Sequence, residues 1–72
     1  MGKEQFMIEE ITKELVLLLI DEQGKNMHDA LRTVYTSDTF AKLCDLKTGL
    51  YTQSTAYIYE YLETELKTGK LS

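Results

Sequence analysis

The stretch Ile8–Ile20, with the sequence IEEITKELVLLLI, decides the fold of this chain. Its principal apolar residues recur at intervals of three or four and therefore share one side of an α-helix: Ile8, Ile11, Leu15, Leu18 and Leu19. This stripe predicts a helix over about 4–23. Gly24 follows the last periodic residue, and a glycine in the left-handed conformation is the usual end of a helix.

The second half of this helix is apolar on almost every side. Leu17, Ile20 and Phe6 lie opposite the main stripe on a helical wheel, and Val16 lies on the flank. A helix of this kind has to be covered all round, either by the chain's own helices or by a second chain. We expect Val16, Leu17 and Ile20 to form a partner interface, and we expect a homodimer with this helix at or near the two-fold axis.

Three further helices are expected after Gly24. Asn26 and Ser37 are good N-caps for helices over 27–36 and 38–48, and Thr52 or Ser54 starts a helix over 54–68. Gly49 and Gly69 end the last two of these segments in the same way as Gly24. No segment has the alternation of a strand, so we predict an all-α, compact four-helix bundle-like domain with short loops and antiparallel-type packing.

The expected inner faces of these helices follow from the same periodicity. They comprise Met27, Ala30, Leu31, Val34, Phe40, Leu43, Cys44, Ile58, Leu62 and Leu66. Residues 1–3 and 70–72 should fray at the two ends of a single domain spanning 1–72.

Composition limits the classes of function that remain. A chain of 72 residues with 43% hydrophobic and 28% charged residues suits one folded domain. One cysteine excludes an internal disulfide, and we find no export signal, membrane anchor or spanning segment, so we expect a cytoplasmic protein. A net charge of −4 without a basic cluster makes nucleic acid an unexpected partner.

Residues for catalysis or metal binding are scarce. His28 is the one imidazole, and its place in a first helical turn beside acids is typical of a solvated histidine. Cys44 shares its spacing with Phe40 and Leu43, which favours an inert packing thiol over a nucleophile activated by His28. No metal-ligand spacing, phosphate loop or dinucleotide motif occurs, so we expect no enzyme, no metal and no cofactor.

The last helix carries an unusual set of tyrosines. Tyr59 lies beside Ile58 and Leu62, whereas Tyr57 and Tyr61 are four residues apart on a flank of their own. Tyrosine combines a large apolar area with a polar tip, which suits both the edge of a core and a partner surface. We predict that Tyr57 and Tyr61 belong to the partner surface.

Two segments resemble a family of short bacterial helical proteins of unknown function. They are Ser37-Asp38-Thr39-Phe40 and Thr48-Gly49-Leu50-Tyr51-Thr52-Gln53-Ser54 followed by Tyr57-Ile58-Tyr59, and the resemblance extends from Phe6 to about Leu66. It implies a bacterial accessory or interaction protein, encoded beside a toxin-like partner in some cases. It supplies no catalytic residue.

Two functions are therefore open. The first is a protein–protein interaction or regulatory module, such as an antitoxin-like accessory protein. The alternative is a helix-turn-helix DNA-binding regulator formed by 27–36 and 38–48. In the candidate recognition helix of that regulator, Asp38 and Asp45 balance Lys42 and Lys47, whereas a surface facing phosphates should be basic.

Overall fold

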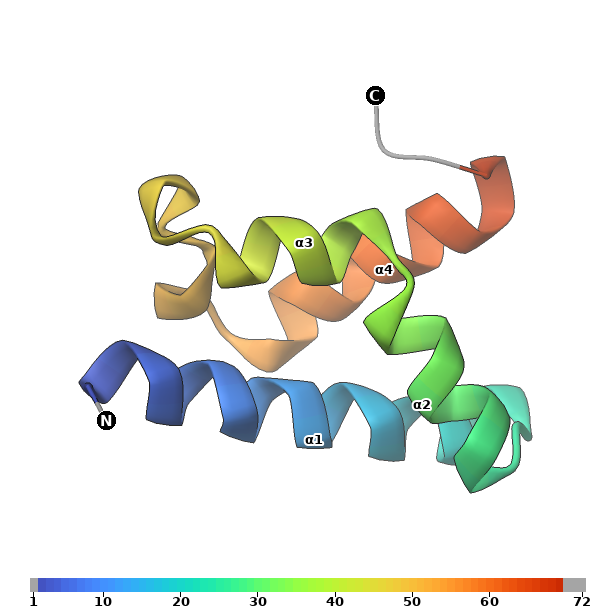
Figure 1. Ribbon diagram of the computed structural model, residues 1–72. Helices are drawn as coiled ribbons and strands as arrows, with labels where there is room; N and C mark the ends of the chain where they lie inside the picture. Colours follow the sequence, from blue (N-terminus) through green and yellow to red (C-terminus); the bar gives the residue numbers. More distant parts are fainter. Residues whose placement is uncertain (1, 70–72) are drawn as a thin grey trace.

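A computed structural model describes residues 2–69 of the chain as an all-α fold. Its helices are α1 (Lys3–Gln23), α2 (Met27–Tyr35), α3 (Asp38–Cys44) and α4 (Thr55–Thr68), and these residues include no strand (Figure 1). The predicted fold class and the order of the four helices are confirmed. Lys3 already belongs to α1, one residue before the predicted start, and Gly2 precedes the helix, while residues 1 and 70–72 lie outside the described part.

Side-chain caps begin three of the helices where the sequence places them. The Asp29 amide donates to Asn26 Oδ1 over 2.8 Å, and the Phe40 and Tyr57 amides donate to the hydroxyls of Ser37 and Ser54. Each cap satisfies a backbone N–H that has no partner inside its helix. Gly24 ends α1 at φ 67°, in the left-handed region that glycine enters without a steric penalty.

The third helix is shorter than predicted. It ends at Cys44, Asp45 is extended, and two 3₁₀ turns, Leu46–Thr48 and Leu50–Thr52, carry the chain to α4. Asp45 accepts a hydrogen bond from the Lys47 amide, and the Thr48 hydroxyl donates to the Lys42 carbonyl over 2.7 Å. These local bonds compete with the helical ladder, so Gly49 ends a 3₁₀ turn and not α3.

The core lies where α1 meets the other helices. In Figure 1, α1 runs along one side of the molecule, α3 and α4 lie across from it, and α2 connects the two sides at one end. Contacts between α1 and each of the other three helices, and between α3 and α4, agree with this arrangement. The buried apolar residues are Ile8, Ile11, Leu15, Val16, Leu19, Ala30, Val34, Leu43, Ile58, Tyr59 and Leu62.

Four residues expected on inner faces are exposed: Met27, Leu31, Cys44 and Leu66. In α2, burial is confined to Ala30 and Val34, so the second apolar stripe of that helix stays open. Cys44 follows the buried Leu43 and therefore projects about a quarter turn away from it. Leu66, in the last turns of α4, is 41% exposed although it shares the spacing of the buried Ile58 and Leu62.

Within residues 2–69, the helices are too short or too polar to cross a bilayer. The longest of them, α1, has 21 residues, but acidic and basic side chains are distributed along it.

Candidate functional site

The predicted interface residues of α1 differ in how far the chain itself covers them. Val16 is 4% exposed and belongs to the core, so the chain itself covers this side chain, and its role in a partner interface stays a prediction. Ile20 is partly buried and packs against the core, whereas Leu17 is 48% exposed. The companion helices therefore cover one flank of α1 and leave the side opposite the main stripe open.

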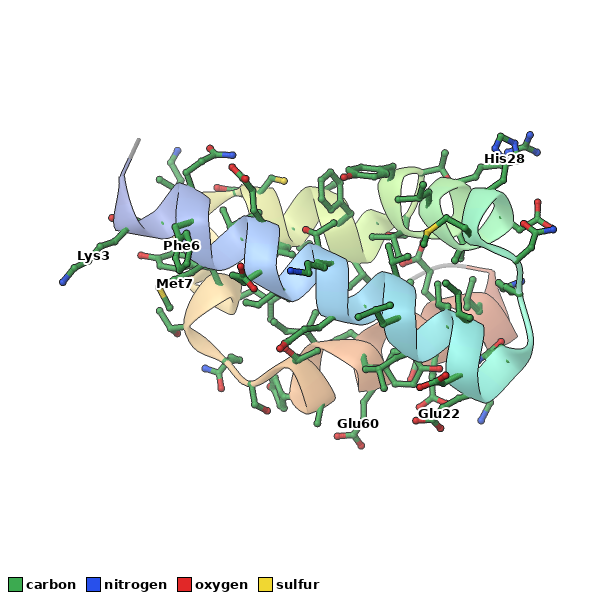
Figure 2. All side chains as sticks on the ribbon, turned by 90° about the horizontal axis from the view of Figure 1, so that it is seen from below. Lys3, Phe6, Met7, Glu22, His28 and Glu60 are labelled. Atoms are coloured by element: carbon green, nitrogen blue, oxygen red, sulfur yellow. The ribbon has the colours of Figure 1, made fainter. Side chains whose placement is uncertain are left out.

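A groove lies between α1 on one side and α2 and α3 on the other. Figure 2 shows α1 in front, with α2 and α3 along its upper edge and α4 along its lower edge. The groove has a volume of about 580 Å³. Its lining residues are Gln5, Ile8, Glu9, Thr12, Lys13, Val16, Leu17, Met27, Leu31, Tyr35, Phe40 and Cys44.

The α2 wall of this groove includes Met27 and Leu31, which the sequence pattern assigned to the inner face. Met27, Leu31 and Tyr35 follow one another at intervals of four and are all exposed, Tyr35 to 55%. The Tyr35 ring packs edge-on against Phe40 of α3, with ring centres 4.9 Å apart. Two apolar stripes on one nine-residue helix were the signal for an open face, because a single neighbouring helix cannot cover both.

The tyrosine flank of α4 lies at the surface. Tyr57 and Tyr61 are exposed while Ile58 and Leu62 are fully buried, as their wheel positions predict. The two tyrosine hydroxyls are 3.1 Å apart and the rings meet edge-on with centres 5.2 Å apart. The hydrogen bond to Tyr61 raises the pKa of Tyr57 above its usual value. Their role at a partner surface stays a prediction.

The candidate nucleophile lacks the environment of a reactive thiol. Cys44 is exposed at the groove, which corrects the expectation of a packing residue, and desolvation by its neighbours raises the pKa of the thiol. A raised pKa reduces the thiolate fraction at neutral pH, whereas activation requires the opposite shift. His28 is exposed, as predicted, and projects from the end of the molecule in Figure 2.

The acidic residues of the described part of the chain are dispersed. Among residues 2–69, no group of three or more His, Cys, Asp or Glu side chains is placed to hold a metal ion. Glu14, which shares a side of α1 with Glu10, accepts a hydrogen bond from the Thr55 hydroxyl and so connects α1 to α4.

No family model, curated protein or solved structure matches the chain. The resemblance to short bacterial helical proteins therefore stays a prediction, and the groove and the exposed sides of α1 and α4 are the basis for inferring a function.

Proposed function

We propose that the protein is a non-enzymatic interaction module, an antitoxin-like or regulatory accessory protein, that binds an amphipathic helix of a partner protein in the α1/α2/α3 groove. The observation that carries this proposal is a groove of about 580 Å³ whose walls hold exposed apolar side chains on two different helices. Apolar side chains gathered in a groove and bordered by polar ones are typical of protein interaction sites.

The spacing of the groove residues favours a helix as the occupant. Met27, Leu31 and Tyr35 span two turns of α2 and present three apolar side chains in line. A helix with apolar residues at three- and four-residue intervals can pack such side chains between its own, as in other helix-in-groove complexes.

Charge indicates the polar face of that partner helix. The chain carries a net charge of −4. Much of it lies on α1, where six acids, Glu4, Glu9, Glu10, Glu14, Asp21 and Glu22, outnumber two bases, Lys3 and Lys13. The groove lining itself holds one acid, Glu9, and one base, Lys13, so the attraction of a helix with lysines or arginines on its polar face would come from the other acids of α1.

The alternative of a DNA-binding regulator receives less support. In a helix-turn-helix the N-terminal residues of the second helix contact base edges. Here the Glu65 carboxylate accepts hydrogen bonds from the Asp38 and Thr39 amides over 2.8 and 2.9 Å, so α4 covers that end of α3. The proposal includes a cytoplasmic location in a bacterial cell. We infer the location from the lone cysteine and the bacterial origin from the family resemblance.

We expect a model helix of leucine and lysine to bind the protein, and a helix with the same leucines but glutamate in place of lysine to bind much more weakly. Leu31→Asn removes apolar area from the groove without changing charge, so it should weaken binding of the lysine peptide about tenfold. Fluorescence anisotropy of labelled peptides measures both affinities. Leu66→Asn, on an exposed leucine outside the groove lining, is the matched control. Equal binding of the two peptides, or an unchanged affinity of Leu31→Asn, would contradict the proposal.

We also propose that the module is a homodimer through α1. Leu17 and Phe6 are 48% and 60% exposed on the side of α1 that faces away from the core. Removing such side chains from water contributes up to about 1.5–3 kcal/mol each, which is large for a small domain. In a symmetric dimer each protomer would cover Leu17 and Phe6 of the other.

Sedimentation equilibrium of the wild type at micromolar concentration should therefore give the mass of a dimer, and Leu17→Lys should give a monomer. The lysine would place a charge in the centre of the apolar contact. Leu66→Lys makes the same exchange at an exposed leucine of α4 and should leave the dimer intact. A wild type that stays monomeric would show that α1 needs no second copy.

A further inference from the structure

The side of α1 that faces away from the core carries an ordered pattern of charge and apolarity. Lys3, Phe6, Glu10, Lys13 and Leu17 recur at alternating intervals of three and four, and all five are exposed. This alternation is the spacing of a coiled-coil seam. We call these five residues the outer ridge, and Ile20 and Asp21 continue it at its C-terminal end.

The outer ridge is complementary to itself in reverse. From Lys3 to Asp21 its order is positive, apolar, negative, positive, apolar, apolar, negative. When two copies run in opposite directions, this order can place Glu10 opposite Lys13 and Phe6 opposite Leu17, and Lys3 then falls opposite Ile20, next to Asp21. We propose that two copies pair antiparallel along this ridge, a proposal that rests on the homodimer proposed above and specifies its orientation and register.

The register follows from the pattern. The two-fold axis crosses the ridge at the level of residues 11 and 12. Phe6 then faces Leu17 of the second copy and Glu10 faces Lys13 of the second copy, and symmetry makes each pair twice. Lys3 reaches the end of the ridge, where its stem lies along Ile20 and its ammonium meets Asp21 of the second copy. Pairs of opposite charge therefore lie at both ends and at the centre of the paired ridges, and the apolar pairs lie between them.

Competing arrangements lack this match. In a parallel pair the residues of the ridge face their own copies, so Glu10 faces Glu10 and Lys13 faces Lys13. An antiparallel pair shifted by seven residues places Glu10 opposite Ile20 and Lys13 opposite Leu17. Both alternatives lose the charge pairs, and the first replaces them with repulsion.

Charge reversal at the centre of the ridge tests this register. Glu10→Lys and Lys13→Glu each create two like-charge contacts across the dimer, so each should weaken self-association about tenfold at low salt. Mixing the two variants places the introduced lysine of one copy opposite the introduced glutamate of the other. The mixture should therefore restore dimers, as heterodimers, to within about threefold of the wild-type affinity. The double variant E10K/K13E should self-associate about as strongly as the wild type, because its introduced lysine faces the introduced glutamate of the second copy. Glu60→Lys, an exposed reversal on α4 that projects away from α1 in Figure 2, is the control for net charge.

The outcomes separate this proposal from the homodimer on which it rests. A dimeric wild type with single variants that dimerise equally well overturns the register and leaves the homodimer standing. A monomeric wild type overturns both. Helix content measured by circular dichroism identifies a variant that fails to fold. Failure of the mixture to form heterodimers from two folded single variants also overturns the register.

Discussion

Leu62→Ala is expected to lower the free energy of unfolding by about 2–5 kcal/mol, whereas Leu66→Ala, one turn further along α4, should lower it by about 1 kcal/mol or less. Leu62 is fully buried and Leu66 is 41% exposed. The cost of a leucine-to-alanine change combines the transfer of the lost side chain with the cavity that remains, and a cavity forms where neighbours enclose the site. Alanine is a good helix former at both positions, so the difference reports packing.

Urea unfolding followed by circular dichroism measures both changes. The variants and the wild type have to be compared at one protein concentration, because self-association adds to apparent stability. Similar losses for the two leucines would mean that α4 packs along its full length, as the sequence pattern alone implied. A negligible loss for Leu62→Ala would contradict the packing of α4 against the core.

The positions of the helices could be predicted because their ends depend on neighbours in sequence. Asn26, Ser37 and Ser54 each cap an amide three residues ahead, and Gly24 adopts the left-handed conformation directly after α1. Such bonds form within a few residues, so the residue types at fixed offsets suffice to predict them. The exception is the 3₁₀ region after Cys44, where side-chain bonds of Asp45 and Thr48 compete with the helix.

The exposure of individual residues depended on distances between helices, which periodicity does not contain. Val16 and Leu17 are adjacent apolar residues, yet Val16 is 4% exposed and Leu17 is 48% exposed. Leu66 has the spacing of a core residue but is 41% exposed. The groove was missed for the same reason: the two apolar stripes of α2 indicate an open face on that helix, but the sequence does not show that α1 and α3 lie beside this face.

A partly buried polar contact between α3 and α4 was also beyond sequence reasoning. The Glu65 carboxylate accepts three hydrogen bonds, from the amides of Asp38 and Thr39 and from the Thr39 hydroxyl, at 2.8–2.9 Å. Thr39 is fully buried, so its hydroxyl depends on this acceptor. In the sequence, 26 residues separate Thr39 from Glu65, and neither position differs visibly from other surface polar residues.

Glu65→Ala is therefore expected to lower the free energy of unfolding by about 2–3 kcal/mol, since it leaves a buried hydroxyl and two amides at the start of α3 without their acceptor. Glu65→Gln keeps an amide oxygen in place and should retain part of that stability, because a neutral acceptor bonds more weakly than a carboxylate. Glu60→Ala makes the same change at an exposed position of α4 and should cost about 0.5 kcal/mol or less. Chemical unfolding curves give the three values. Equal losses for Glu65→Ala and Glu60→Ala would mean that water replaces the carboxylate at no cost, and the contact between α3 and α4 would then depend on apolar packing alone.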